Sequence, residues 1–535
     1  DWSSDVCSSD LAIGMSTELG KVARLLDRDT DRSTPLQRRL AAFGKRLSLV
    51  VIAICVVIFT VGVLRGESPL LMALTAISLA VAAIPEALPA VVTVLLALGA
   101  RKMVTFNALI RRLPSVETLG SVSFICSDKT GTLTQNQMHA EVLLADGESW
   151  QPGEPSPKPV HQELLRAAAL CNDATHTLKG GWAGDPTETA LTQAAGDAGL
   201  HKPTLEQDAQ RVLEFPFDAE RKRMTTFHRT PDGLVAYTKG APEAVLAQCT
   251  SQWQPDGESQ LRRAEVLGAA EKLATQGLRV LALARRSYEQ LPGTGELEAV
   301  ESGLCLIGLI GLIDPPRPEA AAAVRDCISA GITPVMITGD HPATARAIAQ
   351  RLGILTGAES DVLTGADLAA LNDDALRERV RTVRVYARVD PLQKIRIVEA
   401  LQAHGEFVAM TGDGVNDAPA LKQADIGVAM GRGGTDVARE ASSLVLLDDN
   451  FATIVAAVRE GRRIYDNIRK FVRYAMTGNS GEIWTIFLAP LMGLPIPLLP
   501  IHILWINLVT DGLPGLALAA EDRKSTRLNS SHTIQ

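Results

Sequence analysis

The run Cys126-Ser127-Asp128-Lys129-Thr130-Gly131-Thr132-Leu133-Thr134 decides how this chain is interpreted. It follows an apolar segment, residues 122–126, that we expect to form a buried strand and to deliver Asp128 into a turn. A carboxylate held in this way can accept a phosphoryl group covalently. Lys129 and the turn amides would then neutralise the incoming phosphate. An ordinary solvated loop is the alternative, but the length of the string and its partners elsewhere favour a phosphate acceptor.

Three further apolar runs, residues 333–337, 407–411 and 304–313, also end in acidic turns. The turns are Thr338-Gly339-Asp340, Gly412-Asp413-Gly414-Val415-Asn416-Asp417 and Asp314-Pro315-Pro316-Arg317. Ligands of an open parallel α/β sheet bind just beyond the carboxyl ends of its strands. Clustered carboxylates at that edge suit Mg²⁺, and Lys394 adds a cation for a phosphoryl group. The pattern therefore predicts a phosphoryl-transfer site at the edge of a parallel sheet.

Length and composition fit a large protein with soluble and lipid-facing parts. The chain has 535 residues, enough for several domains, and it is 46% hydrophobic but only 4% aromatic. A net charge of −8 argues against nucleic acid as a partner. The seven cysteines are scattered singly. This spacing argues against a zinc site or a disulfide framework and suits a reducing cytosol.

Several segments are apolar enough to cross a membrane. Residues 47–64 carry no charge, and residues 70–100 carry only Glu86. About 20 apolar residues span a bilayer. Basic residues flank both segments, which places those flanks and the region up to about Lys470 in the cytosol. Two less uniform candidates, residues 471–492 and 498–520, follow. We therefore expect a multi-pass membrane protein.

Polar residues inside these segments predict an ion pathway. Glu86 lies between Pro85 and Pro89, which would break a membrane helix and free backbone carbonyls. The other polar residues recur at helical spacing and are Asn479, Glu482, Asn507, Thr510 and Asp511. Ionisable groups within a membrane usually mark an ion path, and oxygen ligands suit Ca²⁺. A polar contact between helices is the alternative.

Together these motifs resemble those of the P-type cation-transporting ATPases, and they are most similar to the calcium pumps of the sarcoplasmic-reticulum subgroup. The resemblance covers about residues 12–521. It implies a multidomain membrane protein with three parts. They are a haloacid-dehalogenase-like α/β (Rossmann-like) phosphorylation domain, an inserted α+β nucleotide-binding domain and an α-helical transmembrane bundle. ATP and Mg²⁺ are the implied cofactors, and Ca²⁺ is the implied transported ion. A lipid bilayer is the expected surrounding, and no obligate protein partner is evident.

The resemblance also implies roles for particular residues. Asp128 would be phosphorylated, while Asp413 and the carbonyl of Thr130 would hold Mg²⁺. The remaining residues of the implied phosphorylation site are Lys129, Thr338, Gly339, Asp340, Lys394, Asn416 and Asp417. The implied ligands of the transported ion are Val81, Ala82, Ile84, Glu86, Asn479, Glu482, Asn507, Thr510 and Asp511. Mn²⁺ and Na⁺ remain alternatives to Ca²⁺ at this site.

The segment between Asp128 and its partner strands resembles the nucleotide-binding domain of the family. Strand-like runs occur at residues 212–215, 234–238 and 280–283. By motif, Phe217 would stack on adenine, a role that its place in Phe217-Asp218-Ala219-Glu220-Arg221-Lys222 favours over a core position. The other implied nucleotide contacts are Glu188, Lys239, Gly240, Arg279 and Arg317. Ala219 stands where the family often has arginine, so one phosphate contact is expected to be missing.

These patterns divide the chain into eight expected parts. They are a non-native end (1–11), an actuator-to-membrane stalk (12–46), two transmembrane helices (47–100), the first part of the phosphorylation domain (101–134), the nucleotide-binding domain (135–303), the second part of the phosphorylation domain (304–458), a stalk with two transmembrane helices (459–520) and a non-native tail (521–535). No Thr-Gly-Glu-Ser motif is present, and the usual later membrane passes are missing. We therefore expect a fragment that does not complete a transport cycle.

Two other functional classes stay open at this point. A soluble haloacid-dehalogenase phosphatase shares the aspartate nucleophile, but such enzymes usually carry a second aspartate two residues later, where this chain has Thr130. A catalytically dead membrane subunit is the other class, and only truncation supports it. The compact inserted domain and the many Ala and Arg residues indicate a bacterial plasma membrane, with the catalytic domains in the cytosol.

Overall fold

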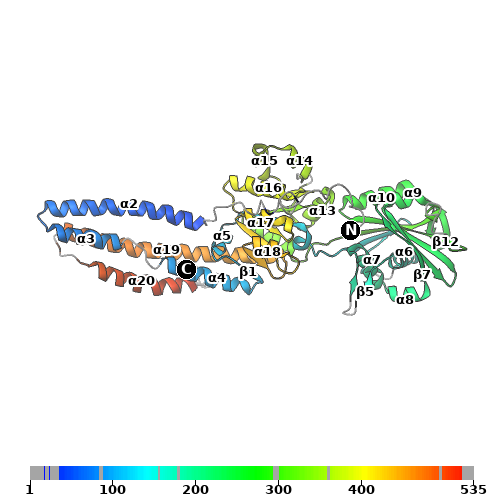
Figure 1. Ribbon diagram of the computed structural model, residues 1–535, viewed down its shortest axis with the longest axis horizontal. Coiled ribbons are helices and arrows are strands. Elements are labelled where there is room, and N and C mark those ends of the chain that lie inside the picture. The colour runs from blue at the N-terminus through cyan, green and yellow to red at the C-terminus, as the bar shows by residue number, and fades with distance from the viewer. Residues whose placement is uncertain are drawn as a thin grey trace, which may run out of the picture.

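The computed structural model describes residues 17, 23, 35–82, 88–154, 157–177, 181–292, 300–357, 362–492, 494 and 497–520. Its described part is elongated, as Figure 1 shows. Long helices lie at one end, a parallel sheet with its helices lies in the middle, and a large, mainly antiparallel sheet lies at the other end. The chain passes from the middle region to the far sheet and back, so the far sheet is an insertion in the middle region.

The middle sheet has eight strands in the order β1-β19-β18-β17-β2-β14-β16-β15. All neighbours are parallel except β1 and β19. The strands are β1 (Ala108–Ile110), β2 (Phe124–Asp128), β14 (Thr333–Thr338), β15 (Val362–Thr364), β16 (Val385–Ala387), β17 (Val408–Gly412), β18 (Ile426–Met430) and β19 (Leu444–Leu446). Continuous apolar runs are typical of parallel strands that are buried on both faces. Three of the runs that the sequence analysis selected, now β2, β14 and β17, are confirmed as strands of this sheet.

Helices cover both faces of the middle sheet. Side chains alternate along β2 and β14, so Ile125 and Met336 enter one core cluster while Cys126 and Val335 enter another. The helices of this region are α5 (Ser115–Ser121), α12 (Ala320–Ser329), α13 (Pro342–Leu352), α14 (Gly365–Ala370), α15 (Asp373–Val380), α16 (Pro391–Ala403), α17 (Ala418–Gln423) and α18 (Asp436–Ala441). With both faces packed, the free place for a ligand is the edge where the strands end.

The second sheet has nine strands, ordered β11-β10-β13-β12-β9-β8-β7, with β3 paired to β13 and β4. The strands are β3 (His139–Ala145), β4 (Glu148–Trp150), β7 (Gln210–Asp218), β8 (Arg223–Thr230), β9 (Gly233–Gly240), β10 (Cys249–Gln254), β11 (Gly257–Gln260), β12 (Arg279–Tyr288) and β13 (Leu304–Ile313). A separate hairpin joins β5 (Thr175–His176) and β6 (Trp182–Ala183). The runs expected near residues 212, 234 and 280 are confirmed as β7, β9 and β12.

Strand β13 lies in a different sheet from the one predicted from the sequence. We expected this apolar run in the parallel sheet and in the second part of the phosphorylation domain, which was to begin at residue 304. Instead β13 pairs with β12, β3 and β10 in the nine-stranded sheet. All ten of its residues are buried. Its continuous apolar character reflects burial on both faces of the second sheet, so the inserted unit extends to about Ile313.

In the described residues, the helices that accompany the second sheet are α6 (Pro159–Leu170), α7 (Pro186–Asp197), α8 (Lys202–Asp208), α9 (Pro242–Gln248) and α10 (Arg263–Thr275). Helix α6 is the clearest case of burial, with Leu164, Leu165 and Ala168 fully enclosed. They pack in one core cluster with Leu283 and Ile310 of the sheet. This packing fixes α6 and its neighbour α7 against the strands that carry the expected nucleotide residues.

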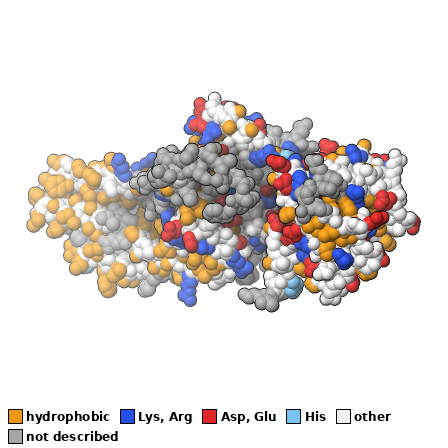
Figure 2. All heavy atoms as spheres, turned by 45° about the vertical axis from the view of Figure 1, so that its right-hand side comes forward, with side chains coloured by type: hydrophobic (Ala, Val, Ile, Leu, Met, Phe, Trp, Pro, Cys, Tyr) orange, Lys and Arg blue, Asp and Glu red, His pale blue; other side chains and the backbone are white. Residues whose placement is uncertain are grey.

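The helical end of the molecule contains α2 (Pro35–Leu64), α3 (Pro69–Ala82), α4 (Leu88–Val104), α19 (Phe451–Leu491) and α20 (Pro500–Ala520). Helix α19 has 41 residues and runs from the middle region into this end (Figure 1). Figure 2 shows hydrophobic side chains covering this end. Among the helices that the structure describes, Ala41–Leu64 alone is long and apolar enough to cross a membrane, while Pro69–Ala82 and Ile501–Thr510 are shorter apolar helices.

Candidate active site

Asp128 lies at the carboxyl end of β2, where its side chain contacts the buried ammonium group of Lys394. Lys394 Nζ donates to Asp128 Oδ2 at 2.9 Å and to Asp417 Oδ1 at 2.7 Å. The position of Lys394 follows from the local sequence. Asp390 and Gln393 form a capping box and Pro391 is the first residue of α16, so Lys394 stands in the first turn of that helix. The structure therefore brings Lys394, the cation expected to meet the phosphoryl group, to the side chain of Asp128.

A third carboxylate, Asp413, follows β17 at the same edge. Burial, together with the charges of Asp128 and Asp417, raises the pKa of Asp413 to about 6. Burial also raises the pKa of Asp128, although Lys394 opposes that shift. Burial alone would lower the pKa of Lys394, but Asp128 and Asp417 outweigh it and raise that pKa. Three carboxylates facing one lysine leave excess negative charge, which disfavours ionisation of Asp413 and would favour a bound cation.

This donor set fits Mg²⁺ in its chemistry. Mg²⁺ is usually bound through one or two carboxylates with phosphate and water oxygens, and Asp128 and Asp413 offer carboxylates at the sheet edge. Among the residues that the structure describes, no group of three or more His, Cys, Asp or Glu side chains is arranged to hold a metal by itself. A site of this kind would therefore depend on oxygens from a phosphate group as well as from the protein.

The segment after Asp128 is held by Lys129 and by the turn that follows β13. Lys129 Nζ lies 2.6 Å from Asp340 Oδ2 and 3.6 Å from Asp314 Oδ2. The hydroxyl of Thr134 also donates to Asp314. Although β13 belongs to the other sheet, its terminal acidic turn thus reaches the Asp128 segment. Lys129 and Asp340, two residues of the expected phosphorylation site, are thus brought together.

The turn after β14 lies beside β2 because the two strands are parallel neighbours in register. Thr338 is buried, and its hydroxyl accepts a hydrogen bond from the backbone nitrogen of Asp340 at 3.1 Å. A Cβ at Gly339 would meet no atom within 4 Å, so the backbone there borders open space. Asn416 is exposed in the short helix Val415–Asp417. The strand ends thus bring Thr338, Gly339 and Asp128 to one edge.

Arg317 lies with the Asp128 segment and not with the other expected nucleotide residues. Its Nη2 donates to the carbonyl of Gly131 at 2.9 Å, and its backbone nitrogen donates to Leu133. Arg317 therefore borders the phosphate end of the site.

Two contacts at this edge were missed by the sequence analysis. The backbone nitrogen of Asp128 donates to Thr411 Oγ1 at 3.0 Å. The backbone nitrogen of Thr435 donates to the carbonyl of Asp413 at 2.8 Å. The position of Thr411 at the end of an apolar run was a usable signal, whereas Thr435 lies beyond β18 in a glycine-rich loop with no motif of its own.

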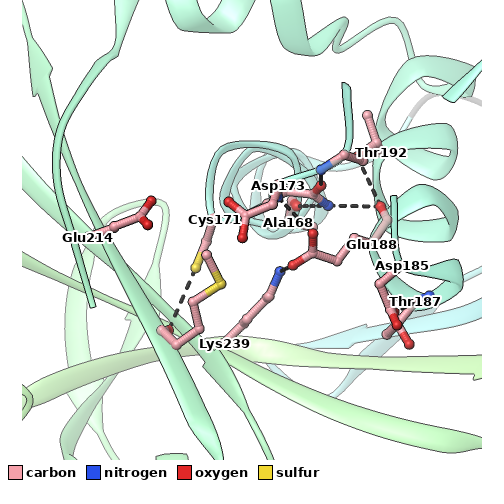
Figure 3. Close-up of polar contacts among 12 residues, drawn as sticks. Ala168, Cys171, Asp173, Asp185, Thr187, Glu188, Thr192, Glu214 and Lys239 are labelled. Atoms are coloured by element: carbon pink, nitrogen blue, oxygen red, sulfur yellow. Dashed lines mark hydrogen bonds and ion pairs between the residues drawn. The ribbon is translucent and has the colours of Figure 1, made fainter. Parts of the chain in front are cut away.

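The expected nucleotide residues Glu188 and Lys239 meet between α7 and β9. Figure 3 shows Lys239 pointing toward the Glu188 carboxylate, with which it forms an ion pair. Asp185 caps α7 and Pro186 is its first residue, so Glu188 stands in the first turn. The other oxygen of Glu188 accepts from the backbone nitrogen of Asp173 at 2.8 Å. This ion pair is largely buried in the second sheet region.

The other expected nucleotide residues of this region are Arg279, Phe217 and Gly240. Arg279 Nη1 donates to Thr187 Oγ1 at 2.9 Å, next to Glu188 in the chain. Phe217, at the end of β7, is 63% exposed, so its ring is not part of the core. Gly240, the last residue of β9, lies against Lys222 in the turn between β7 and β8. A Cβ at Gly240 would lie 2.4 Å from the carbonyl oxygen of Lys222, which explains why this position is glycine. An exposed aromatic ring such as that of Phe217 can stack on a planar ligand.

The expected ion ligands lie only in part within the described structure. Ile84, Glu86 and the side chain of Asp511 fall outside the described residues. Asn479 of α19 is buried, and both polar atoms of its amide are without a hydrogen-bond partner among the residues that the structure describes. In the amide orientation that satisfies its surroundings, Asn507 Nδ2 donates to Glu482 at 2.9 Å. Thr510 is exposed, and its hydroxyl donates to the carbonyl of Ile506.

Comparisons with known proteins agree with this arrangement. Residues 161–319 match a family profile described as "P-type ATPase, cytoplasmic domain N", and residues 495–532 match one described as "Cation transporting ATPase, C-terminus". Two segments of the chain are therefore similar to domains of P-type ATPases. The first match runs through β13, in agreement with its place in the nine-stranded sheet. The second continues through residue 532, into the segment 521–535 that we expected to fall outside the family.

Curated relatives are similar over almost the whole chain. The chain is 48% identical over 534 residues to "Calcium-transporting ATPase" of Bacillus subtilis, a match that covers 95% of this chain and 60% of the relative. It is 44% identical over 537 residues to "Cation-transporting ATPase pma1" of Synechocystis, covering 96% and 59%. It is 46% identical over 541 residues to "Probable cation-transporting ATPase F" of Mycobacterium tuberculosis, covering 96% and 60%. The chain thus spans about 60% of the length of these relatives.

Proposed function

We propose that this P-type ATPase moves Ca²⁺ across a membrane at the expense of ATP, through a phosphoaspartate at Asp128. The observation that carries the proposal is the buried contact between Asp128 and Lys394 at the carboxyl end of β2, with Asp413 and Asp417 beside it. Several similar proteins are named calcium-transporting ATPases. Their names and this site support the same reaction.

In the proposed reaction an oxygen of the Asp128 carboxylate attacks the γ-phosphorus of ATP. The bond from phosphorus to the bridging oxygen breaks, and ADP leaves with the electron pair. Lys394 would neutralise charge on the phosphoryl oxygens, and the backbone at Thr338 and Gly339 would border them. Mg²⁺, held by Asp128, Asp413 and the carbonyl of Thr130, would supply further charge neutralisation. Positioning and electrostatics account for most of the catalysis in such transfers.

We further propose that ATP binds on the nine-stranded sheet, with its adenine near Phe217 and its phosphates directed to the middle region. The exposed ring of Phe217 supports stacking. The ion pair of Glu188 and Lys239 would line the adenine pocket, and Arg279 would meet the phosphates. Arg317, which contacts the Asp128 segment, would meet the phosphates at the other end.

The transported ion would bind between α19, α20 and the helices α3 and α4. Support comes from Asn479, whose buried amide has no hydrogen-bond partner in the described part of the chain, because such a group is costly unless a ligand satisfies it. Glu482 and Asn507 meet nearby. The remaining proposed ligands are Val81, Ala82, Ile84, Glu86, Thr510 and Asp511, of which Thr510 would have to turn from its present hydrogen bond.

This proposal places the chain in a bilayer as a multi-pass protein, with four membrane segments and with both sheets in the cytosol of a bacterium. Only α2 meets the length and hydropathy expected of a spanning helix in the described structure. Helices α3 and α4 have 14 and 17 residues, and the sequence around Glu86 carries Pro85 and Pro89, which suits a helix interrupted at an ion site.

A haloacid-dehalogenase phosphohydrolase and a pump for Mn²⁺ or Na⁺ are the competing functions. Acid quenching of the reconstituted protein after brief incubation with ATP separates them. The proposal predicts an acid-stable phosphoprotein that forms with Ca²⁺ and not with Mn²⁺ or Na⁺ alone. Steady phosphate release without an ion requirement and without accumulated phosphoprotein would instead identify a phosphohydrolase.

A further inference from the structure

Asp449 makes an unusual set of backbone contacts at the point where α19 begins. It lies two residues before Phe451, and only 8% of its surface is exposed. Its Oδ1 accepts from the backbone nitrogens of Gly431 at 2.7 Å and Arg432 at 3.0 Å, and its Oδ2 accepts from Gly433 at 2.8 Å. Successive backbone N–H groups around one anion form a nest that holds both partners in place.

The loop of residues 431–434, which surrounds the Asp449 carboxylate, is packed too closely to accept side chains at Gly431 and Gly434. A Cβ at Gly431 would lie 2.6 Å from the carbonyl of Leu446, and a Cβ at Gly434 would lie 2.1 Å from the carbonyl of Met430. Arg439 closes the other side of the loop, because its Nη1 donates to the carbonyls of Gly431 at 2.9 Å and Gly434 at 2.8 Å. The loop of residues 431–434 is therefore fixed relative to Asp449.

The same loop continues directly to Asp413. Thr435 follows Gly434, and both its backbone nitrogen and its hydroxyl donate to the carbonyl of Asp413, at 2.8 and 3.2 Å. A connection made of hydrogen bonds and of the loop backbone thus runs from Asp449, just before α19, through residues 431–435 to Asp413. The continuous helix α19 also carries Asn479.

We propose that Asp449 is a positioning residue that ties the start of α19 to the backbone of Asp413. Because this inference rests on the proposed function, in which Asp413 holds Mg²⁺ and Asn479 faces the ion, Asp449 would make the Mg²⁺ site sensitive to the position of α19. Packed elements joined by hydrogen bonds can carry such coupling, but only a measured coupling establishes it.

The neighbouring Asp448 provides a matched control. Its carboxylate accepts from Asn450 N at 3.2 Å, from Thr453 Oγ1 at 2.7 Å and from Asn107 Nδ2 at 3.3 Å. These contacts hold the first turn of α19 and the residue before β1, and they do not involve the loop of residues 431–434. Replacing Asp448 with Asn therefore perturbs the same helix end without touching the proposed link.

Hydrogen exchange without Mg²⁺ tests the link itself. In Asp449→Asn, we expect the amides of Gly431, Arg432 and Gly433 to exchange about tenfold faster or more, and the amide of Thr435 to follow them. Asp448→Asn should leave the Thr435 amide as protected as in the unchanged chain. If the three loop amides lose protection while Thr435 keeps it, Asp449 does not reach Asp413 and the inference is overturned.

A Mg²⁺ titration followed by thermal unfolding tests the consequence, since a bound ligand stabilises the folded state. Replacing a residue that hydrogen-bonds directly to a metal ligand typically lowers the affinity for the metal about tenfold to a hundredfold. For the more distant Asp449→Asn we expect the Mg²⁺ midpoint to rise about threefold to tenfold, and for Asp448→Asn no change. An unchanged midpoint in Asp449→Asn contradicts the inference.

A chain that does not respond to Mg²⁺ before substitution would contradict the proposed Mg²⁺ role of Asp413. Hydrogen exchange would still decide the link from Asp449 to Thr435, so the two failures are distinguishable. If Asp449→Asn does not fold, Arg439→Lys takes its place in both measurements, because it weakens the same loop from the opposite side.

Discussion

Lys394 is the cation around which the carboxylates at the edge of the middle sheet are arranged. It donates to both Asp128 and Asp417, and its side chain is 8% exposed. Removing one partner of a buried ion pair leaves uncompensated charge, which costs more than the pair contributes. The charge at this position therefore stabilises the site as well as serving the proposed reaction.

Replacing Lys394 with Met should lower the free energy of unfolding of the middle region by about 3 kcal/mol at pH 7. The loss should be smaller at pH 5, where the carboxylates can take up protons. Denaturant-dependent hydrogen exchange of peptides from β2 measures the effect. Lys394→Arg is the matched control because it keeps the charge, and a loss below about 0.5 kcal/mol in Lys394→Met would refute this account.

Asp413 makes stability depend on pH in a definite direction. Its pKa in the folded chain is raised to about 6 by burial and by Asp128 and Asp417. The folded state therefore binds this proton more tightly than the unfolded state, so the contribution is complete below pH 4 or so and is lost as pH rises through about 6. Without Mg²⁺, the free energy of unfolding should fall over this range. Asp413→Asn should flatten that slope, and an unchanged slope would show that Asp413 titrates normally.

At the scale of elements, α5 and α19 cross at two glycines. A Cβ at Gly461 of α19 would lie 2.8 Å from the backbone nitrogen of Gly120 in α5. The same α19 carries Gly478, where a Cβ would meet nothing within 4 Å. The contact holds the long helix against the region that contains Asp128.

Gly461→Ala should destabilise the packing of α5 on α19 by about 1–3 kcal/mol, because the backbones cannot approach with a methyl group between them. Gly478→Ala should be neutral, or stabilising by up to about 1 kcal/mol, because alanine favours a helix. Thermal unfolding of both variants measures the difference. Equal melting temperatures would mean that the crossing tolerates a side chain.

The sequence was sufficient to predict three of the parallel strands, β2, β14 and β17, because each combines an apolar run with a turn that carries polar residues. The same pattern misplaced β13, since burial on both faces produces a continuous apolar run in either sheet. Asp314 still reached Lys129, because the end of β13 returns to the Asp128 segment. The position of Thr411 at the end of an apolar run left a usable signal. The contacts of Asp449 were not predictable, because they join loops whose approach depends on the packing of the whole middle region.

At the scale of the whole molecule, α19 joins the proposed ion site to the middle sheet. Asn479 lies toward the end of α19, whereas Gly461 and Asp449 lie near its start. One continuous helix thus connects the two proposed sites. A flexible connection would not transmit a movement from one site to the other, whereas a helix can.

Replacing Asn479 with Ala should raise the Ca²⁺ concentration needed for half-maximal phosphorylation by about tenfold, a loss of about 1.4 kcal/mol in ion binding. ATP binding should not change, since the proposed nucleotide residues lie outside the helices that form the proposed ion site. Thr477→Ala is the matched control on the same helix, because its hydroxyl donates only to the carbonyl of Arg473 among the contacts described. If both variants need the same Ca²⁺ concentration for half-maximal phosphorylation, Asn479 is not a ligand of the transported ion.

Phosphorylation of Asp128 is the central claim, and peptide mapping of the acid-stable phosphoprotein formed from radioactive ATP tests it most directly. The account predicts that all label lies in the peptide containing Asp128, that Ca²⁺ is required, and that Asp128→Asn abolishes the label while the variant still binds ATP. Label on another residue, or label that persists in Asp128→Asn, would contradict the account.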